Sequence, residues 1–140
     1  MSSISQIHHD HTELVKIVDE WEAMIDRDTP APTVELFDVR RRLSSLLIAH
    51  LKAEDWVLYP PLLESSDAEI ARVARQFVDE MGGLAAAYNI FMERWDALGI
   101  QADWATYKKE AFGISKALAN RIAREDEELL PLVERASRAA

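Results

Sequence analysis

Residues 50–60 read His50-Leu51-Lys52-Ala53-Glu54-Asp55-Trp56-Val57-Leu58-Tyr59-Pro60, and their spacing guides the interpretation of the whole chain. Within and just before this segment, residues recur at intervals of three and four, which on a helix form one stripe: Leu43, Leu47, His50, Glu54 and Leu58. The stripe therefore turns a histidine and a carboxylate toward the core. Because an unpaired buried polar group costs on the order of 2–7 kcal/mol, both side chains need partners there.

The composition is that of a globular all-α protein. Hydrophobic residues make up 49% of the chain and charged residues 29%, glycine and proline are few, and apolar positions recur with helical period. The length suits one domain, so we expect residues 1–140 to form a single bundle domain. No apolar run reaches the roughly 20 residues that span a bilayer, and we find no signal-peptide pattern. We therefore expect a cytoplasmic protein.

Charge and cysteine content exclude several function classes. A net charge of -9 opposes nucleic acid and anionic membranes as partners. The chain has no cysteine, which excludes disulfides, thiolate metal sites and thiol catalysis, and leaves His, Asp and Glu as the strong metal ligands. We find neither a phosphate-binding glycine loop nor a Ser/His/Asp pattern, so the sequence favours no enzyme class.

Periodicity and capping signals predict four helical segments. The first covers residues 5–27 and carries His11 within an apolar stripe, whereas His8 and His9 lie off that stripe and are expected to be exposed. The second begins with Thr33 as its cap and runs to Tyr59, before two prolines.

The third segment starts at the capping box of residues 66–69 and follows a stripe that ends with Leu98. It is interrupted by Gly82-Gly83, which permits a kink or a close helix approach. Asp103 caps the fourth segment, which runs to near Pro131. Four helices with short connections predict an up-down-up-down four-helix bundle.

Five polar residues fall on the inward stripes of these segments: His11, His50, Glu54, Arg121 and Glu125. The last two belong to an internal echo of the opening segment. His50-x-x-x-Glu54-Asp55-x-x-Leu58-x-Pro60 is matched in spacing by Arg121-x-x-x-Glu125-Asp126-x-x-Leu129-x-Pro131. The second copy has an arginine where the first has a histidine.

With these residues, the chain resembles the haemerythrin-like domains, also called HHE cation-binding domains, over essentially its whole length. The matching features are Asp10-His11, His50-x-x-x-Glu54 with Leu58-Tyr59-Pro60, and Glu125 with Leu129-x-Pro131. The resemblance implies a four-helix bundle with a non-haem di-iron centre. It also implies that His11 and His50 bind one iron, and that Glu54 and Glu125 are the carboxylates that ordinarily bridge both irons.

The departures from the family pattern concern the other iron. The histidine that usually follows a glutamate on the third helix is replaced by Met81, and a further histidine of some members falls on Ala85. The histidine of the fourth helix falls on Arg121, which stays protonated and is not a ligand. At an effective dielectric of about 20, a unit charge about 4 Å away interacts by roughly 4 kcal/mol, repelling a metal and attracting a carboxylate. We therefore expect no two-metal centre.

Two occupancies stay open for the centre. His11, His50, Glu54 and Glu125 are a sufficient ligand set for one iron or zinc ion, for example in binding or sensing dioxygen or nitric oxide. Alternatively, Arg121 ion-pairs with the two glutamates, and a metal-free bundle acts as a regulatory module that binds a protein partner. We favour one metal because the ligand set faces inward. An oxidase is the least favoured class.

Each candidate also has an ordinary structural explanation. A single histidine on an apolar stripe is more often a hydrogen-bonded core residue than a ligand, and His11 stands out only through its coincidence with His50, Glu54 and Glu125. Glu125 lies in an acidic run, which is usually a solvated face, but its place on the inward stripe argues for burial. Met81 is expected to fill the core rather than to bind a haem or a soft metal through its thioether.

Overall fold

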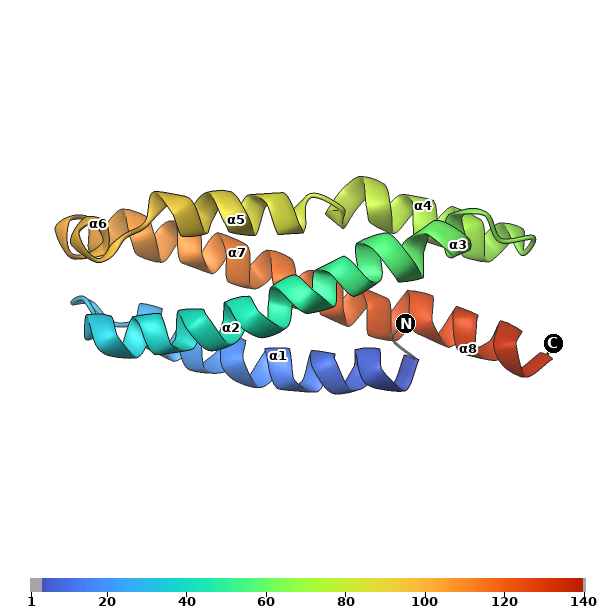
Figure 1. Ribbon diagram of the computed structural model, residues 1–140, viewed down its shortest axis with the longest axis horizontal. Coiled ribbons are helices and arrows are strands. Elements are labelled where there is room, and N and C mark those ends of the chain that lie inside the picture. The colour runs from blue at the N-terminus through green and yellow to red at the C-terminus, as the bar shows by residue number, and fades with distance from the viewer. Residues whose placement is uncertain (1–3, 140) are drawn as a thin grey trace.

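The computed structural model describes residues 4–139, and these contain helices and no strands (Figure 1). The predicted all-α class is confirmed. Residues 1–3 and 140 of the expected domain lie outside the described residues. In chain order the elements are α1 (Ile4–Ile25), α2 (Thr33–Ala53), the π-helix η1 (Glu54–Leu58), α3 (Tyr59–Leu63), α4 (Ala68–Met81), α5 (Leu84–Arg94), α6 (Ala97–Ala102), α7 (Trp104–Arg124), the π-helix η2 (Glu125–Leu129) and α8 (Leu130–Ala139).

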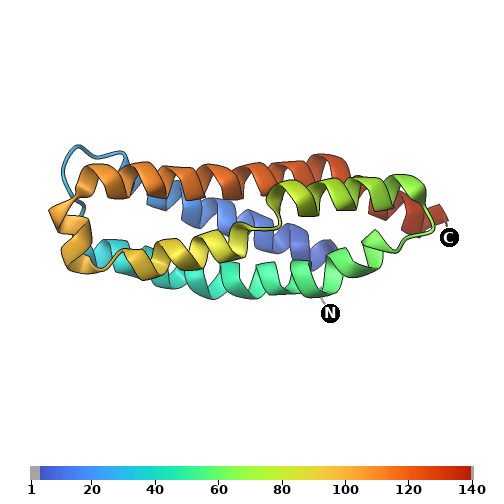
Figure 2. The ribbon, with the colours of Figure 1, turned by 90° about the horizontal axis from the view of Figure 1, so that it is seen from above.

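The helices lie lengthwise in rows along the long axis (Figures 1 and 2). One row is α1, a second is α2 continued by η1 and α3, a third is α4 followed by α5, and the last is α7 continued by η2 and α8. Helix α1 packs against α2 and α7, and α5 packs against α7. Within residues 4–139, no helix combines the length and the apolar content that a membrane span requires.

The first helix buries the face that its periodicity predicts. Its buried residues are those of the predicted stripe: Ile7, His11, Leu14, Val18, Trp21 and Ile25. Most of them join a large apolar core with residues of α2, α5 and α7, and a smaller apolar cluster surrounds Tyr59, Phe77 and Leu129. The buried charged residues belong to neither cluster, so a polar site is built into the bundle interior.

Two π-helical turns carry the repeated motif of the sequence. The N–H of Tyr59 donates to the carbonyl of Glu54, and the N–H of Leu130 donates to the carbonyl of Glu125, each spanning five residues instead of four. Single π-turns inside helices occur frequently at functional sites. Each inward glutamate is therefore the first residue of a widened turn, and the echo in the sequence is also an echo in the structure.

A proline follows each π-turn and explains why the helix widens there. Pro60 and Pro131 have no N–H, and a proline ring clashes with the carbonyl four residues earlier in a regular helix. A wider turn before the proline accommodates both effects without ending the helix. The predicted end or kink of the second segment is thus a π-turn followed by a short continuation, α3.

The Asp103 cap is confirmed, the helix predicted to start at residues 66–69 is capped by Asp67 rather than by Ser66, and the predicted Thr33 cap is wrong. Asp67 accepts hydrogen bonds from the N–H groups of the first turn of α4, and Asp103 accepts one from the N–H of Thr106 in α7. Thr33 is the first residue of α2 and not its cap, since Pro32 precedes the helix and no side chain caps it. The Thr33 hydroxyl instead accepts from the amide of Gln101, 3.1 Å away.

The third predicted segment is not continuous. It breaks at Gly82-Gly83 into α4 and α5, and a short separate helix, α6, follows. Leu98, the last residue of the predicted stripe, is 82% exposed, so its predicted burial is wrong. The chain has left the helical register there, because Trp95 is extended and Asp96 caps α6 by accepting from the N–H of Gly99.

Candidate metal centre

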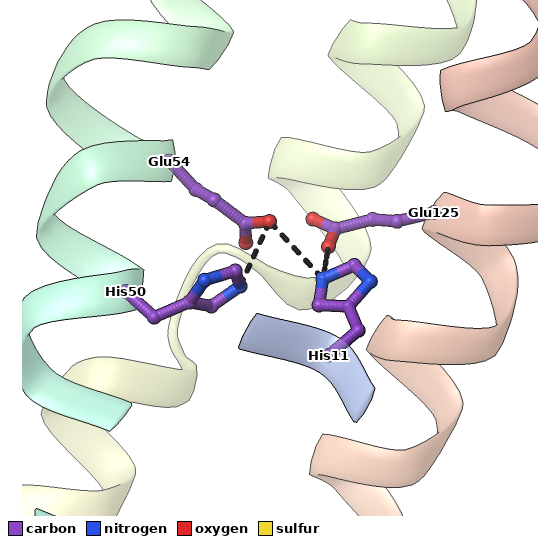
Figure 3. Close-up of side chains that lie close together, drawn as sticks. All are labelled: His11, His50, Glu54 and Glu125. Atoms are coloured by element: carbon purple, nitrogen blue, oxygen red, sulfur yellow. Dashed lines mark ion pairs between the residues drawn. The ribbon is translucent and has the colours of Figure 1, made fainter. Parts of the chain in front are cut away.

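Four side chains from three rows of the bundle converge in its interior: His11, His50, Glu54 and Glu125 (Figure 3). His11 comes from α1, His50 from the end of α2, and the glutamates from the first positions of η1 and η2. All four are buried. The structure therefore brings together the whole ligand set that the sequence predicts, and metal binding by this set stays a prediction.

The facing atoms are two imidazole nitrogens and two carboxylate oxygens. Nε2 of His50 lies 3.0 Å from Oε2 of Glu54, and Nε2 of His11 lies 3.4 Å from the same oxygen. Nε2 of His11 also lies 3.1 Å from Oε1 of Glu125. All four atoms lie within 4.8 Å of one another. The cluster thus offers two nitrogen and two oxygen donors around one point.

These same four atoms lack hydrogen-bond partners. Within residues 4–139, the buried side-chain nitrogen and oxygen atoms without a partner are Nε2 of His11, Nε2 of His50, Oε2 of Glu54 and Oε1 of Glu125. They are close enough for ion pairs, but they do not align as donors and acceptors. Buried polar atoms are nearly always paired, so four unpaired atoms facing one another point to a missing partner that binds all of them.

The spacing of the four atoms fits a small divalent ion. Metal–ligand bonds of about 2.0–2.1 Å to imidazole nitrogen and carboxylate oxygen imply ligand–ligand distances of about 3.3 Å around a tetrahedral ion. Three of the six separations, at 3.0, 3.1 and 3.4 Å, lie around that value, and the others do not exceed 4.8 Å. Neutral imidazole and carboxylate are ligand types that suit both iron and zinc.

Two aspartates hold the imidazole rings from behind. Nδ1 of His11 lies 2.8 Å from Oδ1 of Asp126, and Nδ1 of His50 lies 3.0 Å from Oδ2 of Asp10. A carboxylate that accepts from Nδ1–H leaves the lone pair of Nε2 free to face the cluster. Histidine ligands of metals almost always have such a partner on the second nitrogen. Both rings are therefore oriented as metal ligands are.

Arg121 occupies the far side of the two glutamates. Its Nη2 donates to Oε1 of Glu54 at 2.9 Å and to Oδ1 of Asp55 at 2.7 Å, and its Nε donates to Oε2 of Glu125 at 3.3 Å. Its Nη1 donates to the carbonyl of Met81 at 3.2 Å. The predicted contact of Arg121 with both glutamates is present. Each glutamate thus gives one oxygen to the guanidinium and the other to the cluster.

Tyr59 completes the surroundings of Glu125. Its hydroxyl donates to Oε2 of Glu125 at 2.6 Å, and its ring lies 5.6 Å from the guanidinium carbon of Arg121. Oε2 of Glu125 therefore accepts two hydrogen bonds, which fix the carboxylate so that Oε1 faces His11. Burial and the negative charge of Glu125 raise the pKa of Tyr59, so the phenol stays a donor at neutral pH.

The contacts set the protonation of the centre. Burial opposes protonation of His11, but Glu125, Glu54 and Asp126 outweigh it and raise the pKa of His11 to about 10. The pKa of His50 is also raised against burial, by Glu54 and Asp10. Burial disfavours the charged form of Glu54, yet the two imidazoles hold its pKa below its ordinary value. In the metal-free protein, protons therefore compete with any metal for the imidazoles.

Positions 81 and 85 do not enter the cluster. The sulfur of Met81 accepts from the amide of Asn120, 3.6 Å away, and the side chain lines a surface pocket of about 350 Å³. Ala85 packs against the large apolar core. Neither position contributes a ligand atom to the cluster, and Met81 takes part only through its carbonyl, which accepts from Arg121.

Sequence reasoning missed the residues behind the ligands. Asp10, Asp55 and Asp126 were not predicted to act at the centre, although Asp55 and Asp126 occupy matching positions of the internal echo. Their roles differ, because Asp55 pairs with Arg121 whereas Asp126 pairs with His11. An aspartate directly after each inward glutamate was the available signal, but spacing alone does not show which neighbour it faces.

His8 lies at the outer edge of the cluster and is only partly exposed. Its Nδ1 lies 3.3 Å from Asp126, and its Nε2 lies 3.0 Å from Glu134 of α8. The side chain is 44% exposed, so the predicted exposure of His8 holds only in part, whereas His9 is exposed. Asp126 therefore links the buried His11 to a histidine at the surface.

The chain matches a known family model. The family model described as Hemerythrin HHE cation binding domain matches residues 2–133. No curated protein and no solved structure gives a significant match. The matched range includes His11, His50, Glu54 and Glu125.

Proposed function

This chain belongs to the haemerythrin HHE cation-binding domain family, and from that premise we propose that it binds one divalent metal ion, iron or zinc. The ligands are Nε2 of His11, Nε2 of His50, Oε2 of Glu54 and Oε1 of Glu125. The observation that carries the proposal is that these are the four buried side-chain atoms without hydrogen-bond partners in residues 4–139. A metal ion satisfies all of them at once.

One ion, rather than two, follows from the place of Arg121. Its guanidinium binds the outer oxygens of Glu54 and Glu125, which are the atoms that bridging carboxylates would offer to a second ion. A guanidinium does not lose its proton at any pH that a protein meets. It therefore does not act as a metal ligand, and its positive charge excludes a second metal ion from this position. The centre is thus a reduced form of the family's two-metal site.

We also propose the architecture that this site needs. The lengthwise rows form an up-down-up-down four-helix bundle, with residues 1–140 as one domain, because ligands from three rows must face a common interior. We also propose that the protein acts in the cytoplasm. Nucleic acid and membranes are not its partners, since its net charge is -9.

The proposed role is the binding or sensing of a small ligand such as dioxygen or nitric oxide, rather than oxidase catalysis. A bound iron would supply an open coordination position for a diatomic ligand. The protein's own part is to hold the four donors, exclude bulk water and fix both imidazoles through Asp10 and Asp126. Zinc in the same site would serve a structural or sensing role.

A metal-free interaction module is the second candidate, and the contacts of Arg121 favour it. Arg121 already neutralises part of the charge of Glu54 and Glu125, so the bundle has an internal ion-pair network without metal. In that form the protein would act through its surface on a protein partner. In that form the protonated imidazoles contact the carboxylates as ion pairs, but the four facing atoms do not align as hydrogen-bond donors and acceptors, which is why we place this alternative second.

Metal analysis separates the two candidates. The full-length protein is purified without added metal, its metal content is measured by mass spectrometry, and the metal-stripped form is titrated with zinc and with ferrous iron. We expect one tight equivalent of either ion. Two tight equivalents contradict the role given to Arg121, and no tight binding favours the metal-free module.

A further inference from the structure

We propose that Arg121 makes the centre selective for divalent over trivalent ions, so that bound iron is held in the ferrous state. The inference rests on the proposed metal binding and adds an oxidation state to it. It is carried by one geometric relationship: the guanidinium shares both glutamate carboxylates with the cluster, binding Oε1 of Glu54 and Oε2 of Glu125 while their other oxygens face the histidines.

The fixed cation acts on the ion through two carboxylates. A carboxylate that accepts a charge-assisted hydrogen bond on one oxygen is a weaker donor through the other, and a trivalent ion depends more on strong anionic donors than a divalent ion does. The guanidinium also repels each additional positive charge on the metal. Both effects lower the affinity for the ion, and both are larger for a ferric than for a ferrous ion.

Burial keeps this repulsion from being screened. The Arg121 side chain is 2% exposed, and its N–H groups are taken up by Glu54, Glu125, Asp55 and the Met81 carbonyl. Solvent and salt therefore do not damp its charge as they would at the surface. Asp55 neutralises part of the charge, but the other two acidic partners of Arg121 are the ligands Glu54 and Glu125 themselves.

Two other charged groups near the cluster, Asp10 and Asp126, also affect which oxidation state of the metal is favoured. Asp10 and Asp126 stand behind the imidazoles and add negative charge, which favours higher oxidation states. They contact the histidines and not the glutamates, so they do not offset the weakening of the carboxylate donors. A substitution of Arg121 therefore measures directly the difference that its charge makes at this site.

The test compares three substitutions with a matched control in the full-length protein. Arg121→Gln removes the buried charge, Arg121→Lys keeps it, and Asp55→Asn removes the partner that partly neutralises it. Arg124→Gln is the control, because Arg124 lies on the same helix and pairs with Glu80 and Glu128 near the surface. For each protein, the midpoint potential of the bound iron and the affinities for Zn²⁺ and Ga³⁺ are measured.

Arg121→Gln is expected to raise the affinity for the trivalent relative to the divalent ion by about 250-fold, the size of one charge acting over about 5 Å at an effective dielectric of about 20. At 59 mV per tenfold change, the midpoint potential falls by about 140 mV. Asp55→Asn is expected to shift the potential upward, because it leaves the guanidinium less neutralised. Arg121→Lys and Arg124→Gln are expected to stay close to the unsubstituted protein.

The outcomes separate failure of this inference from failure of the proposed function. Absence of tight metal binding in the unsubstituted protein removes the proposed function and the inference with it. Metal binding with equal potentials in the Arg121→Gln and unsubstituted proteins overturns the inference alone. The same holds if Arg121→Lys lowers the potential as much as Arg121→Gln does, since shape and not charge would then be the cause. If Arg121→Gln does not fold, Arg121→Met, which also removes the charge, decides: a fall in the midpoint potential supports the inference and an unchanged potential overturns it.

Discussion

Oδ1 of Asp126 lies 2.8 Å from Nδ1 of His11, on the side of the imidazole opposite to the nitrogen that faces Glu54 and Glu125. The ring is thereby held between a surface carboxylate and the buried cluster. Asp126 is the residue directly after Glu125, so one stretch of η2 supplies both a candidate ligand and the group that orients another. The widened turn places the two side chains on different sides of His11.

This relationship predicts the effect of Asp126→Asn. Loss of the carboxylate makes the imidazole a poorer and less well oriented donor, and changes to such partners typically lower metal affinity by roughly 10–100-fold. We expect a drop of that size in zinc affinity, measured by competition with a chelator, with little change in helix content. Glu127→Gln, a neighbouring exposed position, is the control and should keep full affinity. An unchanged affinity in Asp126→Asn would show that His11 does not bind the metal through Nε2.

His50→Ala tests the ligand set itself. The substitution removes one of the two nitrogen donors, and the remaining set has only one imidazole with two carboxylates. We expect loss of tight metal binding, measured by metal content after gel filtration, while circular dichroism still shows a helical protein. His9→Ala is the control, because His9 is exposed. Full metal content in His50→Ala would place the site elsewhere in the chain.

Arg121→Met tests how far the ion pairs stabilise the metal-free bundle. Removing the guanidinium leaves Glu54 and Glu125 buried with less compensating charge, and loss of one partner of a buried pair costs about 3–5 kcal/mol. We expect the free energy of unfolding of the metal-stripped protein to fall by that amount, measured with urea. Saturating zinc should recover part of the loss by neutralising the same carboxylates. A loss below about 1 kcal/mol would mean that the network adds little to stability.

The raised histidine pKa values predict a pH dependence with a definite sign. For His11, the pKa rises from 6.5 in the unfolded chain to about 10 in the folded protein. Protonation therefore stabilises the fold fully below pH 6.5, and this stabilisation, on the order of 5 kcal/mol at most, is lost as the pH rises through about 10. His50 shifts in the same direction.

The measurement for this prediction is urea unfolding at several pH values, with chelator and with zinc. The metal-stripped protein should lose stability as the pH rises from 6.5 toward 10, whereas zinc should replace the protons and remove most of the loss. Two parallel stability curves, with and without zinc, would contradict the prediction, because they would show that protons and metal do not compete for the imidazoles.

The helical periodicity was sufficient to predict the face of α1 and the inward direction of the polar residues. His11 lies at the predicted place because a stripe at spacings of three and four fixes which side of a helix is buried. The same logic placed Arg121 in the interior, where it contacts Glu54 and Glu125. These predictions hold because the buried face of a helix follows from the spacing of its own residues and does not depend on the neighbouring helices.

What the sequence did not reveal depends on contacts between rows. The π-turns at Glu54 and Glu125 follow from prolines, but a proline signal equally fits a helix end. The spacing of Leu98 continues the apolar stripe of the third segment in the sequence. In the structure α5 ends before Leu98, because Asp96 caps the next helix, α6. The pairing of Asp10 with His50 joins residues 40 positions apart, which no local pattern specifies.

The break at Gly82-Gly83 predicts opposite outcomes for two adjacent substitutions. The break ends α4 at Met81, whose carbonyl accepts from Nη1 of Arg121 at 3.2 Å. A Cβ at Gly82 would lie 2.5 Å from the carbonyl oxygen of Val78, so the backbone must shift beside that contact. A Cβ at Gly83 would meet nothing within 4 Å.

Gly82→Ala is therefore expected to destabilise the protein by about 1–3 kcal/mol, because the backbone must shift to relieve the contact with the Val78 carbonyl. Gly83→Ala should leave stability unchanged or raise it by about 0.4–1 kcal/mol, because alanine restricts the unfolded chain. Urea unfolding of both variants gives the two values side by side. Because only Gly82 lies next to Met81, metal affinity should change in Gly82→Ala alone. Equal stabilities, or a larger loss in Gly83→Ala, would show that the break is not fixed by the steric contact with Val78.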